Sequence, residues 1–209
     1  CPPPAWPDTV SDVSFQGALV TWEPTGSEAY EYFVSDVNSI SGPEIASDIT
    51  SDAEAAIEGL EPATVYYVFV RGICDGEPGI WSLGTPFTSK GGGVVLCDGT
   101  TMQENYCSYQ NQVVEWMYVS DDGSPLRIEF QSGFVGNQSL QAWDGPTPSG
   151  AAGYTGTGNI TGTHFQAASG VMFIRLTTDN GACHAQDWYL PVQWRIGCRN
   201  CTDPLVTFA

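Results

Sequence analysis

The segment Leu60–Gly72 reads LEPATVYYVFVRG, and it decides how the first part of this 209-residue chain folds. Its run Val65–Val70 consists of β-branched and aromatic residues, which is the composition of a β-strand. Short runs of the same kind, separated by glycine, proline, asparagine and aspartate, recur along the chain: Ala18–Trp22, Tyr30–Val34, Leu126–Phe130, Val171–Leu176 and Leu190–Ile196. Helical periodicity is almost absent, so the sequence predicts an all-β protein made of antiparallel β-sandwiches.

A single glycine run indicates how the chain is divided into domains. Gly91–Gly93 follows Lys90, and such a run is typical of a short flexible linker. The chain is long enough for two domains that each bury a core. We therefore expect two sandwiches in tandem, at 1–89 and 97–198, joined by a linker at 90–96. Residues 199–209 are expected to form a second linker or the start of a following module.

The charge balance excludes several classes of partner. The chain has 6 Lys and Arg residues against 24 Asp and Glu residues, which gives a net charge of −18. Such a surface repels phosphate backbones, so we expect no nucleic-acid binding. The acidic residues are scattered through loops, which is more typical of a solvated face adapted to salt or divalent cations than of one acidic site.

The sequence also bears on membranes and export. It has no run of 18 apolar residues, and Cys1-Pro2-Pro3-Pro4 is not a signal peptide. We expect a soluble segment without direct membrane insertion, with any export signal removed or located outside it.

The first half resembles a fibronectin type III domain. Trp22 in ALVTWEP, Tyr32 in YEYFV and the closing stretch GIWSLGTPFTS contribute to the resemblance. Its main support is the match of six residues to the family signature L-x-P-x-T-x-Y-x-V-x-V: Leu60, Pro62, Thr64, Tyr66, Val68 and Val70. The resemblance covers most of residues 1–89. It implies that Leu60 faces the core and that Tyr66 hydrogen-bonds to the backbone at a corner of the sandwich.

The second half resembles a CUB domain in its bacterial form. LQAWDG (Leu140–Gly145) stands where the family has L-x-I-Y-D-G. GVMFIRLTTDNG and the aromatic closing strand DWYLPVQWRIGC follow in the family's order. The resemblance covers about residues 97–198 and implies a jelly-roll β-sandwich.

Seven cysteines point to an oxidising, extracellular setting. The fibronectin type III resemblance implies a Cys1–Cys74 disulfide, as in bacterial members of the Bacteroidetes type, and closing such a loop contributes a few kcal/mol. Cys198 and Cys201 form a C-x-x-C motif, but it follows a β-strand instead of opening a thioredoxin-like helix, and no second pair completes a zinc site. We interpret Cys201 as unpaired within this segment, with its partner in a following domain.

Two pairings remain open for the other four cysteines. In the first, Cys198 reaches back to Cys97 at the start of the domain and Cys107 pairs with Cys183. In the second, Cys97 pairs with Cys107 and Cys183 with Cys198, which is the nearest-neighbour order familiar from animal CUB domains. We adopt the first pairing as our prediction.

CUB domains often bind calcium through acidic side chains at one end of the sandwich, because a hard cation prefers oxygen ligands. The resemblance assigns Asp144 and Asp179 to such a site. Gln138 and the segment Asn111–Gln112 stand where further carboxylates are expected. Calcium is therefore the one cofactor considered, at a weak site, and the alternative is that both aspartates cap loops. A Cys107–Cys183 disulfide would then replace the ion as a staple between the same loops.

No catalytic site is expected. The two histidines, His164 and His184, lack the partners of a zinc site, and the sequence contains neither G-x-S-x-G nor H-E-x-x-H. Acidic pairs are so frequent in this chain that a glycosidase pair could be drawn almost anywhere.

Aromatic residues are the better candidates for ligand contact. Trp143, Trp188 and Tyr189, with Tyr154 and Phe165, belong to the second domain, whose loops could form a sugar- or protein-binding face. The alternative is that they pack in the core, as most tryptophans do.

Four positions are candidates for glycosylation. Asn137, Asn159 and Asn200 each begin an N-x-S/T sequon in a loop-like place. Thr9 lies in Asp8-Thr9-Val10, which resembles the O-glycosylation motif of Bacteroidetes.

The sequence as a whole favours a non-catalytic extracellular segment of a larger bacterial surface protein or filament, exported by the type IX route and able to repeat in tandem. Expected partners are neighbouring copies or domains of the same parent protein, and surface glycans or proteins. The alternative hypothesis is a carbohydrate- or protein-binding accessory module of a secreted hydrolase.

Overall fold

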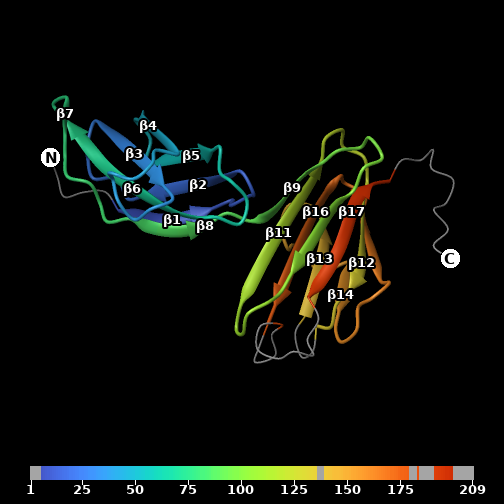
Figure 1. The fold of residues 1–209 in the computed structure, drawn as a ribbon. Helices are drawn as coiled ribbons and strands as arrows, with labels where there is room; N and C mark the ends of the chain where they lie inside the picture. Colours follow the sequence, from blue (N-terminus) through green and yellow to red (C-terminus); the bar gives the residue numbers. More distant parts are fainter. Residues whose placement is uncertain (1–5, 136–138, 179–182, 184–190, 200–209) are drawn as a thin grey trace. The chain divides into compact units, whose positions relative to one another are not determined.

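A computed structural model describes residues 6–135, 139–178, 183 and 191–199 (Figure 1). Every regular element in these ranges is a β-strand, so the predicted all-β fold class is confirmed. The chain divides into two compact units, residues 1–91 and residues 92–209. No helix in the described ranges is long and apolar enough to cross a membrane.

Unit 1 is a sandwich of two sheets. One sheet has the strand order β1 (Pro7–Ser11), β2 (Gly17–Trp22), β5 (Glu54–Glu58). The other has the order β4 (Ala46–Thr50), β3 (Ala29–Ser35), β6 (Val65–Cys74), β7 (Glu77–Pro78), and β8 (Thr85–Thr88) also pairs with β6. Their apolar side chains form one core, which includes Val20, Trp22, Tyr30, Val34, Ile57, Val68 and Val70.

The segment Leu60–Gly72 leads into the central strand of the second sheet. Leu60 is buried, and the Tyr66 hydroxyl accepts a hydrogen bond from the backbone N–H of Glu61 at 2.8 Å. This bond fixes the corner through which the chain enters β6. β6 then pairs with β3, so that Phe69 lies opposite Phe33. The predicted core position of Leu60 and the predicted corner bond of Tyr66 are both confirmed.

Unit 2 is a second sandwich. Its larger sheet has the order β14 (Tyr154–Gly156), β13 (Ser139–Asp144), β16 (Val171–Thr177), β11 (Val113–Ser120), β9 (Gly91–Val95). Its smaller sheet has the order β10 (Met102–Tyr106), β17 (Val192–Cys198), β12 (Leu126–Ser132), β15 (His164–Ala167). The core between them is rich in aromatic and branched residues, including Trp116, Tyr118, Ile128, Phe130, Ile174, Leu176 and Trp194.

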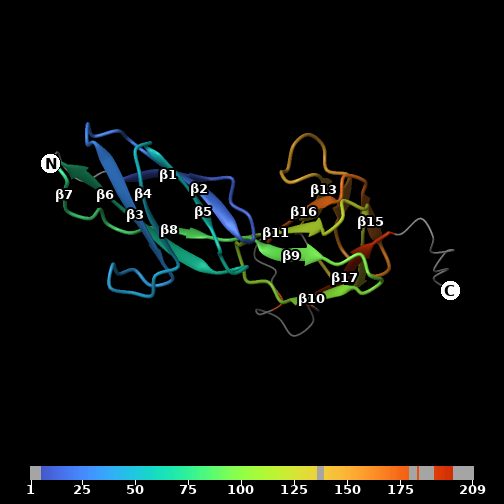
Figure 2. The same ribbon diagram turned by 90° about the horizontal axis from the view of Figure 1, so that it is seen from above.

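The glycine run belongs to a strand of this sandwich. Gly91–Val95 forms β9, which lies beside β11 at the edge of the larger sheet (Figure 2). Gly92 has φ +101°, and a Cβ at this position would overlap the carbonyl oxygen of Met117. Glycine therefore lets the two backbones approach this closely. The linker expected at 90–96 is wrong for 91–95, because these residues form a β-strand in which Gly92 permits close packing against β11.

Candidate functional site

A disulfide joins two distant positions of unit 2. Cys97 follows β9 and Cys198 ends β17, and the two form a disulfide with Cα atoms 5.1 Å apart. The bond connects residues 101 positions apart in the sequence. It is one of the two disulfides of the pairing adopted from the sequence, and it excludes the nearest-neighbour order for these cysteines.

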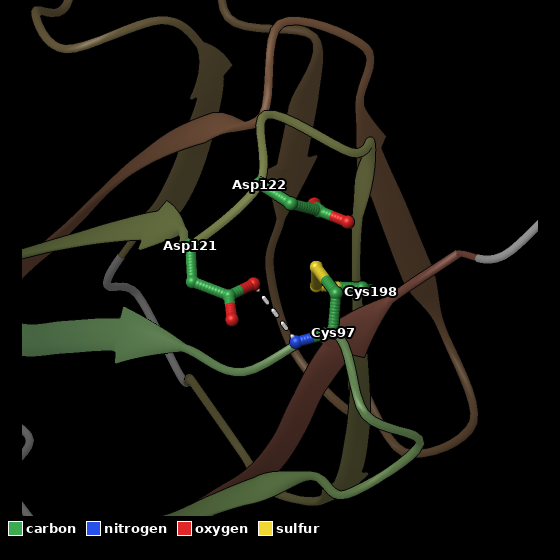
Figure 3. A group of neighbouring side chains, drawn as sticks. All are labelled: Cys97, Asp121, Asp122 and Cys198. Atoms are coloured by element: carbon green, nitrogen blue, oxygen red, sulfur yellow. Dashed lines mark hydrogen bonds between the residues drawn. A yellow bond between two sulfur atoms is a disulfide. The ribbon is translucent and has the colours of Figure 1, made fainter.

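Two aspartates lie beside this disulfide (Figure 3). The ligand atoms of Asp121, Asp122, Cys97 and Cys198 lie within 4.8 Å of one another. A metal ion would need thiolates from the cysteines, and both sulfur atoms are instead bonded to each other. The Asp121 carboxylate accepts a hydrogen bond from the Cys97 backbone N–H at 3.0 Å, so its role here is to fasten Cys97 to the turn after β11.

A second disulfide closes the opposite part of unit 2. Cys107 lies after β10, and it pairs with Cys183 at a Cα–Cα distance of 5.1 Å. The backbone N–H of Cys183 also donates to the Ser108 hydroxyl at 3.5 Å. This disulfide is nested inside the first, because both of its cysteines lie between Cys97 and Cys198 in the sequence.

Hydrogen bonds hold the loop next to Cys107. The buried Thr178 hydroxyl donates to the Tyr109 carbonyl at 2.6 Å and accepts the backbone N–H of Gln112 at 2.9 Å. The Tyr106 hydroxyl donates to the Gln112 side-chain oxygen at 2.8 Å. Gln112 thus holds this loop through neutral hydrogen bonds of its side chain and backbone. The sequence singled out this position but contained no signal for Thr178 as its partner.

The calcium site expected from the CUB resemblance combines Asp144 with Asp179. Asp144 ends β13 and lies opposite Met172, at the beginning of β16. Asp179 lies outside the described residues. Calcium binding by this pair therefore stays a prediction.

Asp144 caps a turn, as the alternative interpretation held. Its two carboxylate oxygens accept the backbone N–H groups of Ala168 and Ser169 at 2.9 and 3.0 Å. Hydrogen bonding from Ser169 holds the pKa of the Asp144 carboxyl below its ordinary value. The carboxylate fixes the connection between β15 and β16.

Trp143 is not available for ligand contact, which corrects the sequence interpretation. Its side chain is 6% exposed, packs edge-on against Phe173 at 5.8 Å between ring centroids, and donates its Nε1–H to the Gly150 carbonyl at 3.4 Å. Tyr154 and Phe165 are partly buried and pack against the core of unit 2. The remaining aromatic candidates, Trp188 and Tyr189, lie outside the described residues.

The other predicted sites are spread over the molecule. Thr9 is exposed on β1, and Asn159 is exposed with its side-chain oxygen accepting the Thr161 backbone N–H at 3.0 Å. His164 is exposed on β15. Cys74 takes part in a disulfide. Outside the described residues lie Cys1, Asn137, His184, Asn200 and Cys201.

Three arginine–glutamate pairs were not anticipated from the sequence. Each joins residues that lie directly opposite each other on neighbouring strands. The pairs are Arg71–Glu31 at 2.6 Å, Arg175–Glu115 at 2.6 Å and Arg195–Glu129 at 2.7 Å. The signal that could have revealed them is an arginine placed between core residues of a strand, where period-2 alternation points it away from the core.

A half-buried carboxyl faces the interior of unit 2. Glu104 lies on the edge strand β10 opposite Trp194, and its strand neighbours Met102 and Tyr106 pack against the core. Trp194 donates its Nε1–H to the buried Tyr118 hydroxyl at 3.0 Å. Burial raises the pKa of Glu104 above its ordinary value. Burial, with a smaller contribution from the charge of Glu104, also raises the pKa of Tyr118.

Comparison with known proteins gives similarity in structure alone. No protein-family model matches this chain, and no curated protein matches it in sequence. It is similar to the fibronectin type III domain of the human collagen alpha-1(XX) chain, with 23% identity and a TM-score of 0.36, over 43% of this chain and 86% of that one. It is also similar to the FN5 domain of Drosophila Lar, with 18% identity and a TM-score of 0.38, over 44% of this chain and 99% of that one. The CUB resemblance of unit 2 and the Bacteroidetes context stay predictions.

Proposed function

We propose that this chain is a non-catalytic, extracellular structural segment of a larger surface protein or filament, and that its pair of sandwiches is a unit able to repeat in tandem. Disulfides form and persist in oxidising compartments, which supports an extracellular location. The proposed parent is a bacterial adhesin of the Bacteroidetes type, exported by the type IX route. Its partners are neighbouring copies or domains of the same parent, and surface glycans or proteins.

The observation that carries this proposal is the Cys97–Cys198 disulfide. It ties Cys97, two residues after β9, to Cys198, the last residue of β17, which is the last strand that the structure describes. The stretch from Cys97 to Cys198 is therefore closed covalently, and only β9 of unit 2 precedes it in the chain. Such a closed stretch suits a serial arrangement, because neighbouring modules can be added at its ends without disturbing its core.

The structural contacts of side chains that the sequence predicted to bind a ligand or ion further support a structural role. Trp143 packs against Phe173, and Asp144 caps a turn. Three arginines are paired with glutamates on neighbouring strands. In the described part of the chain these groups stabilise the sandwich to which each belongs.

Immunogold electron microscopy of intact producing cells tests the proposal. Antibodies against the recombinant 209-residue chain are expected to label surface fibres or tandem beads without permeabilisation. Labelling that appears only after permeabilisation would overturn the extracellular assignment. A glycan-array hit that is lost on Trp188→Ala would favour an accessory binding module instead of a structural segment.

A further inference from the structure

The nested disulfides define how unit 2 transmits force. A pull applied to the chain before β9 and after residue 199 reaches Cys97 on one side and Cys198 on the other. We propose that unit 2 is an inextensible link, in which tension crosses the Cys97–Cys198 bond and bypasses the intervening chain, whose ends are 101 residues apart. The biological use of such a link rests on the proposed function, whereas the load path follows from the covalent connectivity.

The position of β17 shows what the outer disulfide protects. β17 lies between β10 and β12 in its sheet and contributes Val192, Trp194 and Ile196 to the core. Force entering this strand would have to break its pairing with both neighbours and remove these side chains from the core. Cys198 is the last residue of β17, so the disulfide takes up the load before it reaches the strand.

On the other side only β9 lies ahead of the disulfide within unit 2. Its last residue, Val95, accepts the Asp121 backbone N–H at 3.1 Å, and the Asp121 carboxylate accepts the Cys97 N–H at 3.0 Å (Figure 3). These bonds anchor the loaded cysteine to the turn after β11. If β9 were pulled away from β11, the short stretch from Gly92 to Cys97 would lengthen the chain by no more than about 2 nm.

The inner disulfide, Cys107–Cys183, provides a second limit on how far unit 2 can extend. With the outer bond removed, Cys107–Cys183 still closes a stretch whose ends are 76 residues apart. Within the Cys97–Cys198 segment, only the stretches from Cys97 to Cys107 and from Cys183 to Cys198 could then extend. They are about 10 and about 15 residues long and would release about 9 nm together. Full extension from Cys97 to Cys198 would release about 36 nm. The nearest-neighbour pairing would have closed the two short stretches and left the long one extensible, so the observed pairing is the one that locks the unit.

Single-molecule force spectroscopy of the 209-residue chain, held between marker domains of known unfolding length, tests the inference. The oxidised wild type is expected to release no more than about 2 nm from unit 2. Adding a dithiol reductant should convert this into a release of about 36 nm. Cys97→Ala/Cys198→Ala, which leaves no thiol of that pair to exchange, should release about 9 nm.

Cys107→Ala/Cys183→Ala is the matched control, because it also lacks one disulfide but keeps the outer bond. It should behave like the wild type. A release of about 36 nm from unit 2 of the oxidised wild type, or a release from unit 2 of this control that exceeds about 2 nm, would overturn the inference. If a double variant does not fold, the release length of unit 2 in the wild type, compared with and without reductant, still tests the inference. Failure of the proposed function would appear in the immunogold experiment and would leave these lengths unchanged.

Discussion

Glu31 and Arg71 lie directly opposite each other on β3 and β6, and the Arg71 guanidinium also stacks 4.3 Å from the centroid of the Trp81 ring. The same pairing across strands recurs at Glu115 and Arg175 in unit 2. In a chain with a net charge of −18, these arginine side chains are thus placed where they link neighbouring strands. Each of these ion pairs stabilises the sandwich in which it lies.

The planar guanidinium of Arg71 should matter more than its charge. Arg71→Lys keeps the charge but loses the stacking on Trp81, so we expect it to lower the free energy of unfolding by about 1 kcal/mol. Glu31→Gln removes a partly exposed ion pair and should cost only about 0.5 kcal/mol. Urea denaturation followed by circular dichroism measures both. A larger loss for Glu31→Gln would show that the ion pair dominates.

Asp144 should stabilise unit 2 without calcium. Asp144→Ala leaves two backbone N–H groups of the β15–β16 turn unpaired, so we expect a loss of about 1 kcal/mol in the free energy of unfolding. The loss should be the same with added calcium and with a chelator. The stability of Asp144→Asn, which keeps one acceptor oxygen, should lie between that of the wild type and that of Asp144→Ala. A stabilisation by calcium that Asp144→Ala abolishes would restore an ion site at this residue.

Glu104 should make unit 2 less stable as the pH rises. Its pKa is raised in the folded state, so folding favours the protonated form. The stabilising contribution is full below the unfolded-state pKa and is lost as the pH rises through the folded-state pKa. Glu104→Gln should therefore raise the melting temperature at neutral pH and have little effect in acid. Because the cause is burial and not net charge, high salt should preserve the difference; its disappearance in salt would contradict this cause.

The sequence predicted the features that depend on local pattern. The expectations for Leu60 and Tyr66 are confirmed, and they followed from the resemblance of one continuous segment to the fibronectin type III signature. Strand type followed from the β-branched and aromatic runs. These features require only neighbouring residues.

The features that the sequence did not predict depend on register between distant strands. The register of β13 with β16 places Asp144 opposite Met172, near the turn whose backbone N–H groups it caps. The pairing of Glu115 with Arg175 depends on the register of β11 with β16 in the same way. A single sequence does not encode register in any short window, so these relationships appear only in the structure.

The glycines of β9 show how composition can mislead, and they give the last prediction. Gly92 combines φ +101° with close approach to the Met117 carbonyl, whereas Gly99 has φ +92° and only open space where a Cβ would stand. Gly99→Ala therefore measures the cost of the left-handed backbone alone, about 1 kcal/mol. Gly92→Ala adds a clash with the backbone of β11 and should cost about 3 kcal/mol in the unfolding of unit 2. Equal losses in chemical denaturation would mean that β9 does not depend on close packing against β11, and that the glycine run serves flexibility after all.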